Sequence, residues 1–136
     1  MTGRYLLDTG IAGDFIYDRR GVSRKVADAR LRGAVVGTCY PVVGELYFGA
    51  EHSATRGRNL IATRVGLRGL RIWPFDRAAA EEFGRLAALL ERNGRRMQQI
   101  DVQIAAIALT LGHCTVVTTD TDLSAVPGLR VENWAA

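Results

Sequence analysis

Short apolar runs alternate with longer helical patterns along this chain, and no other feature constrains its fold as strongly. The apolar runs predict strands at residues 4–8, 34–37, 70–73, 114–118 and 129–131. Apolar residues at helical spacing predict helices at residues 11–17, 23–32, 41–50, 59–67 and 100–111, and one more between Asp76 and Asn93. Strands that alternate with helices in this way are typical of an α/β fold with a mainly parallel sheet.

The length and composition predict a single domain that covers residues 1–136. A chain of 136 residues can bury a substantial core, and an apolar fraction of 48% excludes general disorder. No apolar run approaches the roughly 20 residues that a membrane-spanning helix needs, and the first residues do not resemble a signal peptide. We therefore expect a cytoplasmic protein that uses no membrane.

The cysteines, histidines and basic residues limit which metal sites and partners the chain can have. Cys39 and Cys114 each lie inside an apolar segment and read as buried free thiols, and two histidines are too few for a typical His/Cys zinc site. The net charge of +4 comes from 17 arginines and one lysine, Lys25, against 14 acidic residues. Arginine suits an RNA backbone or an acidic partner, but a GC-rich coding sequence produces the same bias.

Four acidic residues, each on a different core-forming segment, are the strongest functional signal. Asp8 ends the first predicted strand and Asp120 follows the fourth, while Glu45 and Asp101 lie within helical apolar segments. In open α/β sheets, sites form beyond the carboxyl ends of the strands, where the strand order reverses. If the first and fourth strands flank that reversal, Asp8 and Asp120 face each other there.

Each of these residues also has a purely structural interpretation. Asp8 could cap the following helix, and Glu45 could pair with an arginine. Asp101 could simply be an acid in the first turn of its helix, stabilised there by the helix dipole. Asp120 could be a turn residue. Asp122, two positions later, could share or take over the role of Asp120 in a site. One shared site explains the set better. Without His or Cys, such a cluster selects Mg²⁺ or Mn²⁺, which assist phosphodiester hydrolysis.

Five segments, in this order and spacing, resemble the PIN-domain family, specifically the VapC-type ribonuclease toxins of toxin–antitoxin pairs. They are Tyr5-Leu6-Leu7-Asp8-Thr9, Val43-Gly44-Glu45-Leu46-Tyr47-Phe48-Gly49, Asp101-Val102-Gln103-Ile104-Ala105-Ala106, Val117-Thr118-Thr119-Asp120, and Val126-Pro127-Gly128-Leu129 with Trp134. The resemblance implies a three-layer α/β/α fold whose first and fourth strands are neighbours. It also implies a Mg²⁺- or Mn²⁺-dependent endoribonuclease.

The resemblance assigns roles to particular residues and implies partners. Asp8, Glu45, Asp101 and Asp120 correspond to the family's acidic site, and Thr118 matches a hydroxyl position that supports it. The implied substrate is RNA. The implied assembly is a homodimer, inhibited by a small antitoxin whose tail covers the active-site groove.

Two further positions bear on activity and RNA binding. Many relatives carry Asn or Ser where this chain has Gly10, so a side chain that could orient Asp8 is missing. That departure leaves open a PIN-like binding module without catalysis. Arg95 and Arg96 precede the helix of Asp101 and are candidates to flank the groove, although solvated loop residues would look the same.

Two other function classes compete with the toxin. One is a PIN nuclease of RNA processing that has no antitoxin. The other is a receiver domain of two-component signalling, which would need a lysine after a late strand. Because Lys25 lies in an early predicted helix, the sequence argues against the receiver domain.

Overall fold

The computed structural model describes residues 3–136, so residues 1 and 2 of the expected domain lie outside the described part. The strands are β1 (Arg4–Leu7), β2 (Val35–Cys39), β3 (Arg71–Trp73), β4 (Cys114–Val117) and β5 (Arg130–Glu132). The helices are α1 (Thr9–Ile16), α2 (Val22–Leu31), α3 (Tyr40–Glu51), α4 (Arg56–Leu67), α5 (Arg77–Arg92) and α6 (Gln99–Leu111). A 3₁₀ helix, η1 (Thr121–Ala125), follows Asp120, for which a turn position was one of the alternatives. The predicted elements are present, with ends shifted by a few residues.

The five strands form one parallel sheet in the order β3-β2-β1-β4-β5. From β1 the chain builds outward to β2 and β3, then crosses to the other side of β1 for β4 and β5. The strand order therefore reverses between β1 and β4. This confirms the expected neighbourhood of the first and fourth strands, and it places the carboxyl ends of both at the reversal point.

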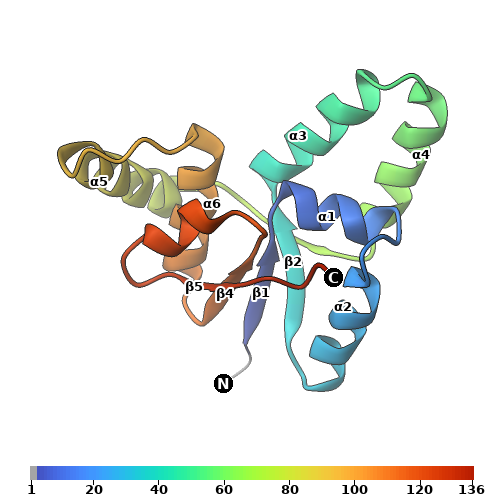
Figure 1. The fold of residues 1–136 in the computed structure, drawn as a ribbon, viewed down its shortest axis with the longest axis horizontal. Helices are drawn as coiled ribbons and strands as arrows, with labels where there is room; N and C mark the ends of the chain where they lie inside the picture. The colour runs from blue at the N-terminus through green and yellow to red at the C-terminus, as the bar shows by residue number, and fades with distance from the viewer. Residues whose placement is uncertain (1–2) are drawn as a thin grey trace.

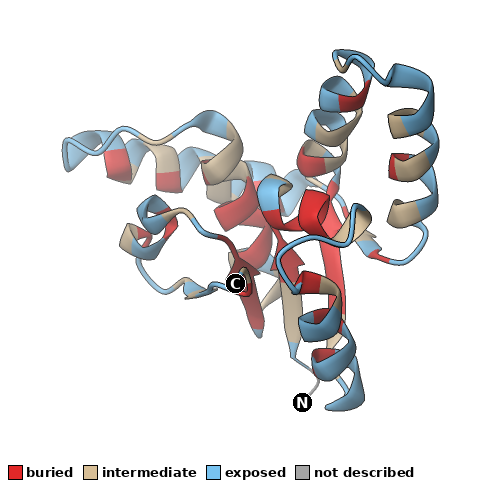
Figure 2. Cartoon of the chain, turned by 45° about the vertical axis from the view of Figure 1, so that its right-hand side comes forward, coloured by how far each residue is buried: buried red, intermediate tan, exposed pale blue. Residues whose placement is uncertain are grey.

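Helices cover both faces of the sheet and complete three layers. Helices α1 to α4 contact one another on one side, while α5 and α6 pack together on the other, where α6 contacts β4 (Figure 1). The buried residues concentrate in the central strands and on the sheet-facing sides of the helices (Figure 2). In β1 and β4, Leu6, Leu7, Val116 and Val117 have no exposed surface, as expected for strands covered on both faces. The α/β/α prediction is confirmed.

Thr38 shows how the end of β1 is fixed. Thr38 precedes the helix that carries Glu45, but β2 continues through this residue and α3 has no side-chain cap. The buried hydroxyl instead donates a hydrogen bond to the carbonyl oxygen of Leu7, at 2.7 Å. A β-branched threonine suits a strand, and the bond satisfies a carbonyl just before Asp8.

Two glycines allow close packing around this centre. A Cβ atom on Gly37 of β2 would clash with the backbone oxygen of Arg71, and one on Gly66 of α4 would lie 2.6 Å from Cγ1 of Ile16 in α1. The second contact sets how closely α4 approaches α1. Within residues 3–136, no helix combines the length and apolar character needed to cross a bilayer.

Candidate active site

Asp8 follows β1 directly and is held from two sides. Its backbone N–H donates to the carbonyl oxygen of Val117 in β4, at 3.0 Å. Its side-chain Oδ1 accepts a hydrogen bond from the N–H of Ile11, at 2.9 Å, and so caps α1. The capping role that we weighed against a site role is therefore real. Because the cap uses one oxygen, it orients the carboxylate without occupying it fully.

Thr118 connects the ends of β1 and β4. The residue is 2% exposed, and its Oγ1 accepts a hydrogen bond from the N–H of Asp120, at 2.9 Å. The same hydroxyl is a hydrogen-bond partner of the Asp8 carboxylate. One buried hydroxyl thus fixes the loop of Asp120 and the side chain of Asp8, which is the geometry that a supporting residue needs.

Asp120 and Asp122 lie at the start of η1. Asp120 caps it, since its Oδ1 accepts a hydrogen bond from the N–H of Asp122, at 2.9 Å. Asp120 is half-buried and Asp122 is exposed. The backbone therefore aims Asp120 at the reversal point and leaves Asp122 at its margin.

Glu45 projects from α3 and is exposed, although its sequence neighbours are apolar. No ion pair involving Glu45 is present among residues 3–136, so the arginine partner that we considered is not found. Instead, Oγ1 of Thr9 donates a hydrogen bond to its Oε1, at 2.6 Å. Thr9 follows Asp8, so this bond ties Glu45 to the end of β1.

Asp101 lies in the first turn of α6 and responds to every other acid of the cluster. Burial raises the pKa of Asp101 to about 6, helped by the charges of Asp120, Asp8, Glu45 and Asp122, in that order. Burial also raises the pKa of Asp8, and the charges of Asp120 and Asp14 add to this, while hydrogen bonds from Thr118 and Ile11 oppose it. The fold therefore brings together the acids that the sequence singled out.

The chemistry of the donor atoms fits a hard divalent cation. The cluster offers carboxylate oxygens, whereas the two thiols lie buried in the core and burial raises the pKa of each to about 12. Within residues 3–136, no three Asp, Glu, His or Cys side chains already stand close enough to enclose an ion. Like charges repel, and Mg²⁺ is commonly held by one or two carboxylates with water and substrate phosphate, so a closed cage is not required.

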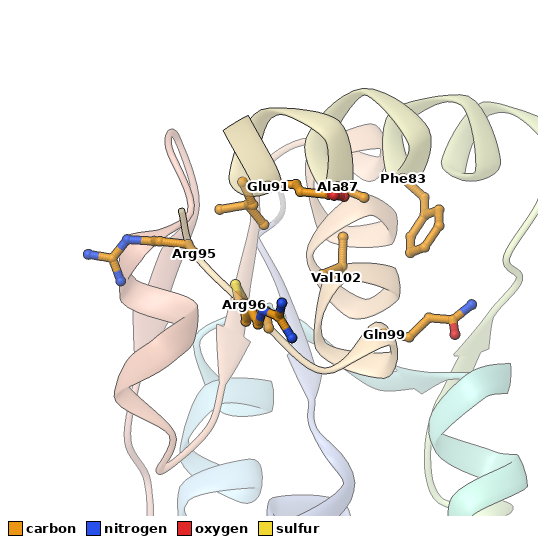
Figure 3. A pocket seen from close by; sticks show the side chains of 9 residues that line it. Phe83, Ala87, Glu91, Arg95, Arg96, Gln99 and Val102 are labelled. Atoms are coloured by element: carbon orange, nitrogen blue, oxygen red, sulfur yellow. The ribbon is translucent and has the colours of Figure 1, made fainter. Parts of the chain in front are cut away.

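Arg95 and Arg96 lie in the loop between α5 and α6, and both are exposed. They line a cavity of about 490 Å³ between these two helices, together with Phe83, Ala87 and Val102 among others. In Figure 3 the side chain of Arg95 extends away from that of Phe83. The loop leads directly into α6, the helix of Asp101, which keeps both arginines near the acidic cluster in the chain. RNA contact by these arginines stays a prediction.

A second hollow, which the sequence analysis missed, opens beside Glu45. It has a volume of about 500 Å³ and is lined by Thr9, Gly10, Gly13, Tyr17, Arg19, Glu45, Leu46, Gly49, Ala50, Asn59 and Thr63. These residues come from α1, α3, α4 and the loop after α1, and we call the hollow the α1–α3–α4 groove. Tyr17 and Arg19 lie two positions apart in the sequence, but the sequence does not show that they line the same groove as Glu45.

Comparison with known proteins decides the family. The model of the PIN domain family matches residues 5–129, which includes all five acids discussed above. The chain belongs to the PIN domain family.

Two curated PIN relatives are nucleases. The chain is 34% identical to the tRNA(fMet)-specific endonuclease VapC of Shigella flexneri over 91 residues, which is 67% of this chain and 69% of that protein. It is 35% identical to ribonuclease VapC2 of Haemophilus influenzae over 92 residues, 68% of this chain and 70% of that protein.

Solved PIN structures agree with the fold. A chain of DNA-bound VapBC from Salmonella typhimurium matches with a TM-score of 0.87 and 27% identity, covering 99% of this chain and 100% of that one. A chain of VapBC2 from Rickettsia felis, bound to a promoter DNA fragment, matches with a TM-score of 0.88 and 24% identity, over 96% of this chain and 98% of that one. At that identity the second match supports the fold alone.

Proposed function

We propose that this protein is an endoribonuclease that depends on Mg²⁺ or Mn²⁺ and acts as the toxin of a type II toxin–antitoxin pair. The observation that supports the proposal is the sheet order, which sets β1 beside β4 and so brings the residues that follow them, Asp8 and Asp120, to the reversal point. Burial, together with the charges of Asp120, Asp8 and Glu45, also raises the pKa of Asp101. The nuclease relatives among VapC proteins support the reaction class.

In this proposal Asp8, Asp101 and Asp120 hold the metal, with Glu45 on the α3 side and Asp122 as an alternative at the margin. Thr118 keeps the Asp8 carboxylate in place, and Thr9 does the same for Glu45. A divalent cation held by these residues would favour the ionisation of water and would stabilise negative charge during phosphodiester hydrolysis. The residues themselves position substrate and water, and they lose their mutual repulsion when the cation binds.

The partners follow from the same relatives. Solved VapBC structures contain a chain of this fold, and VapBC is a family of toxin-antitoxin systems. We propose that a small antitoxin covers the acidic site of this chain. We also propose a homodimer in the cytoplasm, where RNA is available. A short upstream reading frame that encodes a DNA-binding protein would favour the toxin over an RNA-processing nuclease without antitoxin.

The decisive experiment incubates purified protein with total RNA in Mg²⁺, Mn²⁺ or EDTA and maps the cleavage ends. We expect cleavage at discrete positions with either ion and none with EDTA. Asp101→Asn should abolish cleavage, while Asp28→Asn, which changes an exposed aspartate on α2, should retain it. Full activity of purified Asp101→Asn protein, or activity that requires Zn²⁺ instead, would contradict the proposal.

A further inference from the structure

We propose that the α1–α3–α4 groove binds the single-stranded RNA next to the bond that is cut, with Tyr17 and Arg19 as the residues that hold a neighbouring nucleotide. This inference rests on the proposed ribonuclease function. It adds a substrate-binding site outside the acidic cluster and assigns a role to two residues that the mechanism does not use.

The groove is continuous with the acidic cluster. Thr9 and Glu45 line one end of it, and these two side chains are joined by the 2.6 Å hydrogen bond described above. From Thr9 the groove follows one face of α1 past Gly13 to Tyr17. At a rise of 1.5 Å per residue this path is about 12 Å long, so the far end lies beyond the metal-binding residues but within reach of the same RNA strand.

The far end carries an aromatic ring and a guanidinium that already lie against each other. The guanidinium carbon of Arg19 lies 5.1 Å from the centre of the Tyr17 ring. Its Nε lies 3.5 Å from Oδ1 of the buried Asp14, which orients the side chain but leaves it 59% exposed. Arg20 makes the closer pair with Asp14, at 2.6 Å, so the charge of Arg19 is not needed to neutralise that carboxylate.

A ring beside a cation is what single-stranded nucleic acid requires. Bases stack on aromatic side chains whatever their identity, and arginine binds the phosphate between them. Tyr17 is 38% exposed and can offer its ring. Among the described residues that line the groove, Arg19 is the only cation and Glu45 the only anion, so the charge that attracts phosphate lies away from the acids that cut.

Glycines leave the groove open where a flat base would enter. A Cβ atom on Gly49 would have no neighbour within 4 Å, and one on Gly10 would meet only Oδ1 of Asp8, at 3.8 Å. Both glycines line the groove. The missing side chain at Gly10, which we first regarded as a loss for the acidic site, therefore widens the entrance beside Glu45.

The test separates binding from chemistry by measuring KM and kcat for cleavage of a fluorescein-labelled single-stranded RNA, across a range of salt concentrations. The variants are Arg19→Gln, Tyr17→Leu and Gly49→Leu, and none of them alters an acid of the cluster. The matched controls are Arg24→Gln on the exposed side of α2 and Gly57→Leu on α4, where a Cβ atom would also meet nothing within 4 Å. Thermal unfolding checks that each variant folds.

We expect Arg19→Gln to raise KM and to lower the salt dependence by a slope of about 0.7, the value for one phosphate contact on a single strand. Tyr17→Leu should raise KM roughly tenfold through lost stacking. Gly49→Leu should raise KM by filling the groove, with kcat unchanged in all three and both controls like wild type.

Wild-type KM and salt slope in Arg19→Gln and Gly49→Leu would overturn the inference while leaving the ribonuclease intact. If these variants weakened binding of the antitoxin but not of RNA, the groove would belong to the protein partner and the inference would again be wrong. Failure of the wild-type protein to cleave RNA with Mg²⁺ or Mn²⁺ would instead refute the proposed function itself.

Discussion

Asp101 is the residue on which the rest of the acidic cluster acts. Its carboxylate belongs to α6, on the opposite side of the sheet from the helix of Glu45, yet four other acids raise its pKa together with burial. Removing this one charge should therefore relieve repulsion across the whole site. Its effect on stability can be predicted with a definite sign.

The first prediction concerns pH. The folded pKa of Asp101, about 6, lies above its ordinary value of 3.8, so folding disfavours the charged form. Its contribution to stability is fully present below pH 3.8 and is lost as the pH rises through about 6. Asp101→Asn should thus stabilise the metal-free protein at neutral pH by about 1 kcal/mol, less than the full shift implies because solvent screens a partly exposed group.

Chemical denaturation in EDTA at several pH values measures this gain. It should shrink toward zero near pH 4, where the wild-type carboxyl is protonated. Asp28→Asn, on the exposed surface of α2, should show no comparable pH-dependent gain. A loss of stability in Asp101→Asn at neutral pH would show that the carboxylate is held by favourable partners rather than repelled.

The residues of the cluster could be predicted from sequence, but their contacts could not. An acid that directly ends a buried strand, such as Asp8, has its place fixed by the strand itself. Glu45 is different, because its neighbour Thr9 lies 36 positions away and is set by how α3 packs on α1. Its exposure could not be predicted either, since an apolar sequence neighbourhood does not fix which way a helical side chain points.

At the scale of elements, α4 is positioned by the absence of a side chain. Gly66→Ala would push a Cβ atom against the stiff, β-branched Ile16 of α1. We predict that it destabilises the protein by about 1–3 kcal/mol despite the better helix propensity of alanine. Gly57→Ala in the same helix meets nothing within 4 Å and should be neutral or slightly stabilising. Equal effects of the two changes on urea denaturation would contradict this account.

The loop between α5 and α6 gives a second prediction at this scale. Replacing Arg95 and Arg96 with alanine should weaken RNA binding and lower its salt slope by about 1.4 if each contacts one phosphate of a single strand. Arg24→Ala with Arg32→Ala is the matched control, because both arginines are exposed, one on α2 and the other at its C-cap. Affinities equal to wild type at every salt concentration would make Arg95 and Arg96 ordinary solvated loop residues.

Element types followed from the sequence more reliably than element ends. The apolar runs were long enough to identify the strands, yet β2 extends through Thr38 because that hydroxyl has a partner on β1 rather than on α3. The 3₁₀ helix η1 could not be told from a turn in the sequence, since the same Thr and Asp residues favour both. The hydrogen bond from the N–H of Asp122 to Oδ1 of Asp120 suits either structure, and only the backbone hydrogen bonding of residues 121–125 distinguishes them.

At the scale of the whole molecule, metal binding and folding are linked. We predict that Mn²⁺ binds weakly without RNA, because substrate phosphate completes the coordination shell. An ion concentration equal to the dissociation constant should stabilise the fold by only about 0.4 kcal/mol. Thermal unfolding in a Mn²⁺ series should show this gain in wild type and a smaller one in Asp101→Asn. Tight Zn²⁺ binding in calorimetry, with activity that follows it, would count against the site.

The central place of β1 has a consequence for the timing of activity. A chain leaves the ribosome from its N-terminus, so β1 can pair with β2 well before β4 has been made. Asp8 gains its bond to Val117, and Asp120 as its neighbour, only after β4 has emerged. A nascent chain therefore carries an incomplete set of acids, and we expect it to cleave no RNA until β4 joins the sheet.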